Sequence, residues 1–194
     1  PLAVGLQAAE KAKIIPGETA LIMGCGPIGL VIALTALAGG CSKVFVADIA
    51  SEKLRMCENY SNLIPIDLNK ENPIEVIKKN TNNWGANIIF EASGANKAYD
   101  VIFDSICPAG RVVIVGNPMN SVPMDFATLL TKEIEIKTVF RYAHQYERAI
   151  NLLSSNKINV KPMITDTVAF NDSIKAFERA AKNLPEDVKI QIQL

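Results

Sequence analysis

Metal-ligating residues are scarce in this sequence of 194 residues. It has one histidine, His144, and four cysteines, Cys25, Cys41, Cys57 and Cys107, none of which forms a C-x-x-C pair. Protein zinc sites combine several such ligands, commonly at short spacings. The sequence therefore predicts no metal site within this chain. Unpaired thiols in apolar stretches are typical of a reducing compartment, so we expect a cytoplasmic location.

An excess of charge of either sign is also lacking. Lys+Arg and Asp+Glu number 20 each, and there is no basic run and no acidic tail. Nucleic acids and anionic membrane surfaces attract proteins with concentrated positive charge, so we expect neither as a partner. The opening PLAVGLQAAEKAK carries its lysines after the apolar residues, which is not the order of a secretory signal peptide.

One stretch has no charged residue at all. It covers residues 19–42, TALIMGCGPIGLVIALTALAGGCS. Its length is sufficient to cross a bilayer, which takes about 20 apolar residues. However, the glycines and the proline of GCGPIG are unfavourable in the middle of a continuous helix. We interpret the stretch as a buried strand, TALIM, and a helix that begins at Pro27 and ends before Gly39. We therefore expect no membrane span.

The alternation of strand and helix continues to Phe140. After the first strand, the expected strands are residues 43–48, 63–67, 86–93, 110–117 and 133–140. Helical stretches separate them, and the first of these is expected over residues 51–60. Apolar strands separated by helices indicate a parallel sheet that is covered on both faces. The sequence thus predicts an α/β fold with a doubly wound, six-stranded parallel sheet.

The pattern changes in the last part of the chain. We expect helices over residues 146–158 and 171–182, and strands over residues 163–170 and 187–194. This C-terminal α/β tail does not extend the strand–helix series of the main sheet. We expect it to belong to a second domain.

The motif GCGPIG places Gly24, Gly26 and Gly29 in the spacing G-x-G-x-x-G, between the first strand and the following helix. In that context Gly24 permits a tight turn, Gly26 lets a pyrophosphate approach the backbone, and Gly29 lets the helix pack closely on the strand. The helix N-terminus offers free N–H groups to the phosphates. The motif therefore predicts a dinucleotide-binding loop.

Asp48 ends the next strand, nineteen residues after Gly29. This is close to the position of the acidic residue that accepts hydrogen bonds from a ribose diol. Its charge would repel a 2′-phosphate, which favours NAD over NADP. A methyltransferase also has an acidic residue here, but its glycine loop usually reads G-x-G-x-G, and this chain has Ile28 at the last position.

Longer motifs resemble the medium-chain, zinc-type alcohol dehydrogenases. They are PGETALIMGCGPIGL, VADIASEKL, FEASG and GRVVIVGNP. The stretch TVFRYAHQYERAINLLSSNKINVKPMIT is similar more narrowly to the polyol branch, the sorbitol and xylitol dehydrogenases. The resemblance implies an NAD-binding Rossmann domain with a lead-in helix over residues 1–141. Residues 142–194 would return to the catalytic domain.

The resemblance also implies which residues contact the cofactor. They are Gly24, Gly26, Pro27, Ile28, Gly29, Asp48, Lys53, Ala92, Ser93, Gly94, Gly116, Asn117, Phe140 and Arg141. Lys53 would reach the adenosine ribose, and Gly116 and Asn117 would line the nicotinamide ribose. Arg141 would also face the hydroxyls of a polyol or ketose substrate, and is the single residue expected on the catalytic side.

In this family the catalytic zinc is bound by the N-terminal catalytic domain, which this sequence does not contain. An opening without methionine also suggests a processed or truncated chain. The principal hypothesis is the NAD-binding domain of a zinc-dependent polyol dehydrogenase, which oxidises a sugar alcohol to a ketose and is inactive as an isolated chain.

Two other functions remain open at this point. One is a domain of a zinc-independent enone or quinone reductase, although many such enzymes prefer NADPH and Asp48 disfavours it. The other is a non-catalytic NAD-binding module. Under any of the three functions we expect a homo-oligomer joined through the strand Glu133–Phe140, because a second copy can pair with the free groups of an edge strand.

Overall fold

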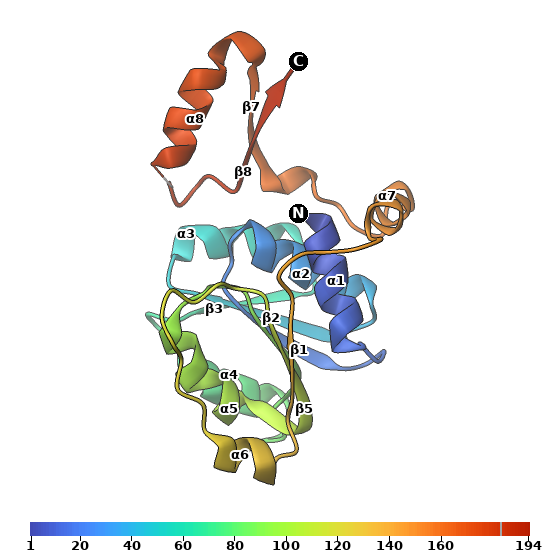
Figure 1. Cartoon of the computed structure of the whole chain (residues 1–194), viewed down its shortest axis with the longest axis vertical. Helices are drawn as coiled ribbons and strands as arrows, with labels where there is room; N and C mark the ends of the chain where they lie inside the picture. Colours follow the sequence, from blue (N-terminus) through green and yellow to red (C-terminus); the bar gives the residue numbers. More distant parts are fainter. Residues whose placement is uncertain (183) are drawn as a thin grey trace.

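The structure is a computed structural model that describes residues 1–182 and 184–194 (Figure 1). The strands are β1 (Thr19–Met23), β2 (Lys43–Asp48), β3 (Leu63–Asp67), β4 (Ala86–Glu91), β5 (Ile106–Ile114), β6 (Glu135–Thr138), β7 (Ile164–Ala169) and β8 (Lys189–Gln193). The α-helices are α1 (Leu2–Ala12), α2 (Pro27–Ala38), α3 (Ser51–Leu54), α4 (Pro73–Asn80), α5 (Tyr99–Ser105), α6 (Phe126–Thr131), α7 (Tyr146–Ser154) and α8 (Ser173–Ala181). Short 3₁₀ helices are η1 (Arg55–Asn59), η2 (Asn96–Ala98), η3 (Lys161–Met163) and η4 (Phe170–Asp172).

The main sheet has six strands in the order β3-β2-β1-β4-β5-β6, and every pair is parallel. The strand order reverses between β1 and β4, which gives the two halves of a doubly wound sheet. The predicted fold class is confirmed. In such sheets a ligand binds at the reversal point, outside the carboxyl ends of the strands.

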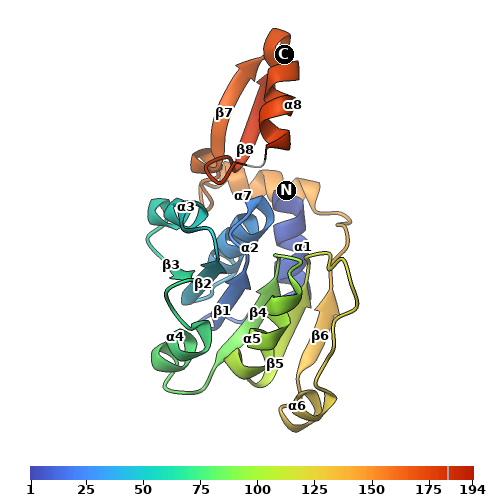
Figure 2. The ribbon, with the colours of Figure 1, turned by 90° about the vertical axis from the view of Figure 1, so that its left-hand side faces the viewer.

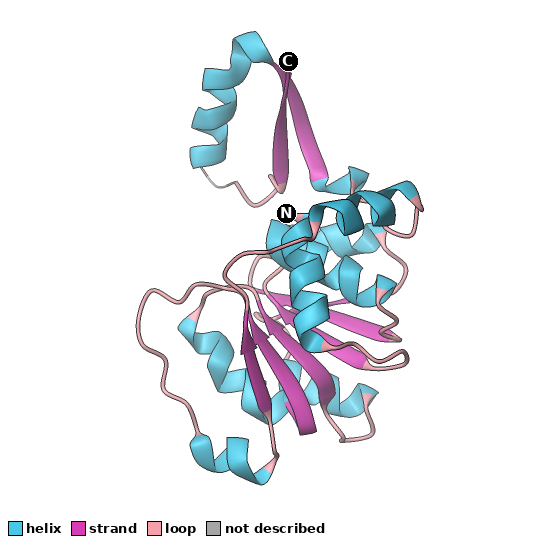
Figure 3. Cartoon of the chain, turned by 45° about the vertical axis from the view of Figure 1, so that its right-hand side comes forward, coloured by secondary structure: helices cyan, strands magenta, loops and turns pink. Residues whose placement is uncertain are grey.

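Helices cover both faces of this sheet, which explains why the inner strands β2, β1 and β4 are mostly buried (Figures 1 and 3). On one face, α1, α2 and η1 pack on strand residues such as Ile22, Val46 and Phe90. On the other, α4 and α5 pack on Leu21 and Phe45, among others. Successive residues of a strand point to opposite faces, so each strand contributes to both cores.

The charge-free stretch forms the strand and helix that the sequence predicts. β1 comprises TALIM, and α2 begins at Pro27 and ends at Ala38. Among the helices that the structure describes, none is long and apolar enough to cross a membrane. The helix expected over residues 51–60 is shorter than predicted, because α3 has four residues and the chain continues as the 3₁₀ helix η1.

The last strand of the sheet is shorter than the predicted range Glu133–Phe140. Glu133 has a φ of 52°, in the left-handed region. Its N–H donates to the carbonyl of Leu130, and that of Ile134 donates to Leu129. These two bonds form the C-terminal cap of α6. Glu133 and Ile134 therefore belong to the helix cap, and β6 begins at Glu135.

The C-terminal tail forms a strand–helix–strand unit of its own. β7 and β8 pair in parallel, with α8 between them in the chain, and neither strand joins the main sheet. The expectation that the tail leaves the main sheet is confirmed, but the tail repeats the parallel crossover on a smaller scale. Figure 2 shows this unit projecting beyond α7, away from the six-stranded sheet.

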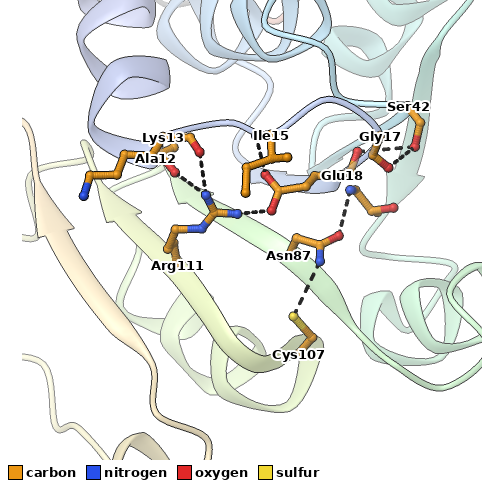
Figure 4. A network of polar contacts seen from close by, with 10 residues as sticks. Ala12, Lys13, Ile15, Gly17, Glu18, Ser42, Asn87, Cys107 and Arg111 are labelled. Carbon is orange, nitrogen blue, oxygen red and sulfur yellow. Dashed lines mark hydrogen bonds and ion pairs between the residues drawn. The ribbon is translucent and has the colours of Figure 1, made fainter.

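A buried arginine fastens the lead-in helix to the sheet (Figure 4). The Arg111 guanidinium, on β5, donates to the carbonyls of Ala12 and Lys13 at 2.7 Å each, and forms an ion pair with Glu18. The Arg111 and Glu18 side chains are only 11% and 13% exposed. The cation thus neutralises the carboxylate and satisfies carbonyls at the C-terminal end of α1.

We expect Arg111→Met to lower the free energy of unfolding by about 3 kcal/mol, because it leaves the Glu18 carboxylate shielded from water without its partner. Arg148→Met is the matched control. Arg148 pairs with Glu10, but those side chains are 54% and 51% exposed, so its loss should cost less than about 1 kcal/mol. Urea denaturation of both variants measures the difference, and equal effects would contradict a structural role for Arg111.

Candidate cofactor-binding site

The residues that the sequence assigns to a cofactor site all follow carboxyl ends of strands in the main sheet. The glycine motif follows β1, Asp48 ends β2, and the segments 92–94, 116–117 and 140–141 follow β4, β5 and β6. Because the strands are parallel, all these segments lie along the same edge. The reversal of strand order between β1 and β4 falls within this edge.

The three glycines of the motif occupy three different environments. Gly24 has a φ of 106°, and a Cβ there would lie 3.0 Å from the Ser93 nitrogen. A Cβ at Gly29 would lie 1.9 Å from the Gly24 carbonyl oxygen, so only glycine lets α2 approach β1 this closely. A Cβ at Gly26 would meet nothing within 4 Å. The space next to Gly26 is where a ligand could contact the backbone.

The N-terminus of α2 adds hydrogen-bond donors to this space. Gly26 is the N-cap residue and Pro27 the first residue of the helix, and no side chain caps it. The first N–H groups of a helix have no partner within the helix, and together they favour an anion. Ile28, next in the chain, is half-buried. The loop thus offers backbone N–H groups without a competing carboxylate of its own.

Asp48 is fixed against this loop by two backbone donors. Its Oδ2 accepts from the Cys25 N–H at 2.6 Å, and its Oδ1 accepts from the Ala50 N–H at 2.8 Å. A carboxylate has about four acceptor positions, so two stay available for hydroxyl groups. Lys53, on α3, is half-buried, and its backbone carbonyl accepts a hydrogen bond from the Cys25 thiol.

The loops after β4 and β5 touch through their backbones. A Cβ at Gly94 would lie 2.9 Å from the Asn117 carbonyl oxygen, and one at Gly116 would lie 2.3 Å from the Gly94 nitrogen. Ala92 bonds to β1 through its N–H, which donates to the Met23 carbonyl. The segments 92–94 and 116–117 therefore form one continuous wall beside the glycine loop.

Sequence reasoning did not identify Glu91, the buried carboxylate that organises this wall. Its Oε1 accepts from the Ser93 N–H at 2.8 Å, the Ser93 hydroxyl at 2.5 Å and the Gly94 N–H at 3.0 Å. Its backbone carbonyl accepts from the N–H groups of Val115 and Gly116. Its Oε2 is buried without a hydrogen-bond partner among the described residues. The acidic end of the apolar strand sequence ANIIFE is the signal that could have found it.

Asp67 is a second acidic residue at this edge, at the end of β3. The Lys70 ammonium, the Ser51 hydroxyl and the Asn69 N–H hold the pKa of its carboxyl below the ordinary range. Three of its about four acceptor positions are thus already used by protein donors. This distinguishes Asp67 from Asp48, which bonds only to backbone N–H groups.

Phe140 and Arg141 lie at the end of the edge beyond β6. Both are exposed, and the Arg141 guanidinium lies 5.2 Å from the centre of the Phe140 ring. This is within range of a cation–π contact. No hydrogen bond joins Arg141 to the glycine loop among the described residues.

The residues that the structure describes do not form a zinc site. In the part of the chain that the structure describes, no group of three or more His, Cys, Asp or Glu side chains could hold a metal ion. The four cysteines are buried as free thiols.

Comparison with known proteins identifies the family. The family described as zinc-binding dehydrogenase matches residues 27–155, which is more than half of the chain. The chain belongs to the zinc-binding dehydrogenase family. The resemblance to the zinc-type alcohol dehydrogenases is thereby confirmed.

The relatives include proteins named for polyol metabolism. The chain is 43% identical to the D-xylulose reductase of Morganella morganii, over 94% of this chain and 54% of the relative. It is 31% identical to the sorbitol dehydrogenase of Bacillus subtilis strain 168, over 99% of this chain and 55% of the relative. The chain thus spans about half the length of the curated relatives it matches.

A solved structure supports the same fold. The 2R,3R-butanediol dehydrogenase of Bacillus subtilis superposes with a TM-score of 0.92 at 24% identity, over 100% of this chain and 56% of that one. At this identity the likeness supports the fold and nothing further.

Proposed function

We propose that this chain is the NAD(H)-binding part of a polyol dehydrogenase, which oxidises a secondary alcohol of a sugar alcohol to a ketose. The observation that carries the proposal is the joint placement of Gly26 and Asp48. The open backbone at Gly26 begins α2, and the Asp48 carboxylate bonds to the same loop at 2.6 Å. A ligand that combines a pyrophosphate with a ribose diol matches both features. The polyol class rests on the names of the relatives.

In this proposal each segment at the carboxyl edge of the main sheet binds a defined part of the cofactor. Gly24, Gly26, Pro27, Ile28 and Gly29 form the pyrophosphate cradle, and the α2 N-terminus supplies donors. The bound NAD would supply the hydride acceptor. The described residues do not form a site for zinc.

The remaining residues bind the two ends of the cofactor. Asp48 and Lys53 take the adenosine ribose. Ala92, Ser93 and Gly94 face the adenosine side of the cofactor, and Gly116 and Asn117 line the nicotinamide ribose. Phe140 and Arg141 also contact the cofactor, and Arg141 also faces the polyol. Glu91 keeps the wall of segments 92–94 and 116–117 in place through its bonds to Ser93 and Gly94.

The domain organisation and location follow from the same proposal. Residues 1–141 form the Rossmann domain, and residues 142–194 belong to the catalytic domain. The separate sheet of β7 and β8 supports this division. The buried free thiols support a cytoplasmic location.

Titration of the purified chain with NADH and with NADPH tests the cofactor assignment. We expect NADH to bind at least about tenfold more tightly, because a 2′-phosphate would lie next to the Asp48 carboxylate. Equal or tighter binding of NADPH would contradict the role of Asp48, and absence of binding to either would contradict the proposed function.

We expect this chain alone to have no polyol dehydrogenase activity, with or without added zinc, since it contains no set of zinc ligands. The measurement is NADH formation from NAD with sorbitol or xylitol. Binding of NADH by the same sample is the control for a folded cofactor site. Zinc-dependent NADH formation by a pure sample would show that the prediction is wrong.

We also propose that two copies associate through the free edge of β6, which is the last strand of the sheet. The Val139 N–H donates inward to the Ile114 carbonyl. Because N–H groups alternate sides along a strand, the Thr138 N–H points to the free edge. Exposed apolar residues nearby, including Phe126 and Phe140, add area that a second copy could cover.

Thr138→Pro removes this outward donor and should convert a dimer to a monomer in light scattering. Thr138→Ala keeps the N–H and should leave the dimer intact. A wild-type monomer at high concentration, or a dimer that persists in Thr138→Pro, would contradict association through β6.

A further inference from the structure

Two cysteine thiols are in contact at the glycine loop. Cys25 lies within the loop, between Gly24 and Gly26, and Cys57 lies on η1. Their Sγ atoms are 3.9 Å apart, and both residues are buried, at 0% and 1% exposure. No other pair of thiols is in hydrogen-bond contact among the described residues. These are two of the four free cysteines.

This geometry is close to that of a disulfide. An S–S bond is about 2.05 Å long, so the sulfur atoms need to approach by about 1.9 Å. Rotation of the two side chains, together with small shifts of η1 and of the Cys25 peptide, can supply this movement. The segment that carries Cys57 is suited to such a shift, because α3 has four residues and neither α3 nor η1 has a side-chain cap.

Local opening of the same segment, residues 51–59, would expose the two sulfur atoms to an oxidant. Neither thiol is exposed in the folded chain, so reaction needs a local opening. Short, uncapped helical segments open at lower free-energy cost than the strands of a buried sheet. We therefore expect the reaction to be slow, and limited by the opening of residues 51–59.

The two sulfurs differ in proton affinity. Contact with the Cys25 sulfur lowers the pKa of Cys57, while the same contact and burial raise the pKa of Cys25. A thiolate is the form that reacts with oxidants. This order makes Cys57 the first sulfur to react and Cys25 the resolving thiol in the reaction described next.

We propose that Cys25 and Cys57 form a reversible disulfide in response to peroxides, and that this bond weakens cofactor binding. The Cys57 thiolate attacks one peroxide oxygen, the O–O bond breaks, and the leaving hydroxide takes up a proton to form water. The Cys25 sulfur then attacks the sulfenic acid on Cys57, the S–O bond breaks, and a second water leaves with the Cys25 proton. Two thiols lose two electrons in total, and one hydrogen peroxide becomes two waters. An external dithiol reverses the reaction.

The expected effect on the cofactor follows from the position of Cys25, and this part rests on the proposed function. The Cys25 N–H donates to the Asp48 carboxylate at 2.6 Å, and the next residue is Gly26 with its open face. A bond to Cys57 pulls this peptide toward η1 and away from its place beside Asp48. Bound NAD should in turn favour the dithiol form at equilibrium, because a disulfide that weakens NAD binding is itself disfavoured by NAD to the same extent.

The first experiment tests the bond itself and does not depend on NAD. The purified chain is treated with hydrogen peroxide, remaining thiols are alkylated, and the protein is mapped by mass spectrometry. We expect a Cys25–Cys57 cross-linked peptide and alkylation of Cys41 and Cys107 only. Four alkylated thiols, or a cross-link between any other pair, would overturn the proposal.

The second experiment tests the effect on binding. NADH is titrated into reduced chain, oxidised chain, and oxidised chain treated with dithiothreitol. We expect oxidation to weaken NADH binding by about tenfold, and reduction to restore it. Cys57→Ser should bind NADH like the reduced wild type and lose the response to peroxide, while Cys41→Ser should keep the response.

The two experiments separate this proposal from the proposed function. A reduced chain that does not bind NADH contradicts the proposed function, whereas the mapped disulfide would stand by itself. A mapped disulfide with unchanged NADH affinity overturns the regulatory part. An equal loss of affinity in oxidised Cys57→Ser would do the same, because the effect would then come from another residue.

Discussion

Gly26→Ala should lose NADH binding and keep the fold. An alanine Cβ at this position meets no atom within 4 Å, so the folded chain can accept it. The methyl group would occupy the space through which the proposed pyrophosphate reaches the backbone. Overpacking of this kind costs about 2 kcal/mol, which corresponds to roughly thirtyfold weaker binding. Isothermal titration with NADH and thermal unfolding of the same sample measure the two effects.

Gly29→Ala is the matched variant and should show the opposite profile. Its Cβ would lie 1.9 Å from the Gly24 carbonyl oxygen, so α2 must move away from β1. We expect a loss of about 3 kcal/mol in the free energy of unfolding. If Gly26→Ala were the less stable of the two, or bound NADH like the wild type, the assignment of the open face to the cofactor would be wrong.

The second large effect is expected for Asp48→Asn. The substitution keeps the size of the side chain but removes the charge that should bind a ribose diol. Hydrogen bonds to a charged group contribute about 1.5–3 kcal/mol, so NADH affinity should fall by at least about tenfold. The ratio of NADPH to NADH affinity should rise, because the repulsion of a 2′-phosphate is gone.

Asp67→Asn is the control for this effect. Asp67 ends the neighbouring strand at the same edge, but its oxygens are bound by Lys70, Ser51 and Asn69. Its substitution should lower stability and leave the cofactor ratio unchanged. A similar change of the ratio in both variants would indicate a general loss of negative charge at this edge, and would refute a specific role for Asp48.

The sequence predicts the first strand and helix well for a definite physical reason. The run TALIM is buried on both faces, and Gly24, Pro27 and Gly39 mark the points where the backbone changes conformation. The apolar run and the glycine and proline residues therefore indicate the same boundaries for the strand and the helix. The same reasoning placed β2 at Lys43–Asp48, because charged residues bound the apolar run on both sides.

The start of β6 could not be predicted in this way. The alternating sequence EIEIKTVF fits a strand from Glu133, yet Glu133 and Ile134 close the C-terminal turn of α6. A left-handed residue at a helix end is usually glycine, and a glutamate gives no such signal. The residue at which β6 begins depends on where α6 ends. The alternating pattern of the strand gives no information about the end of that helix.

The sequence also did not predict which polar side chains are buried at the site. Glu91 reads as an ordinary acidic residue at a strand end, and its role depends on three donors from the following loop. The contact of Cys25 with Cys57 joins residues that are 32 positions apart. Both features arise from packing between segments, whereas the glycine motif is a local pattern with fixed spacing.

The Arg111–Glu18 ion pair has a practical consequence for engineering this chain. It lies next to the amino ends of β1 and β6, since Glu18 directly precedes β1 and Arg111 pairs with Glu135, the first residue of β6 (Figure 4). The proposed cofactor contacts lie at or beyond the carboxyl ends of the strands. Substitutions that raise thermal tolerance can therefore be sought at the first edge and changes of cofactor preference at the second. A variant library divided along this line would let the two properties be selected in separate rounds and then combined, because distant sites usually contribute additively.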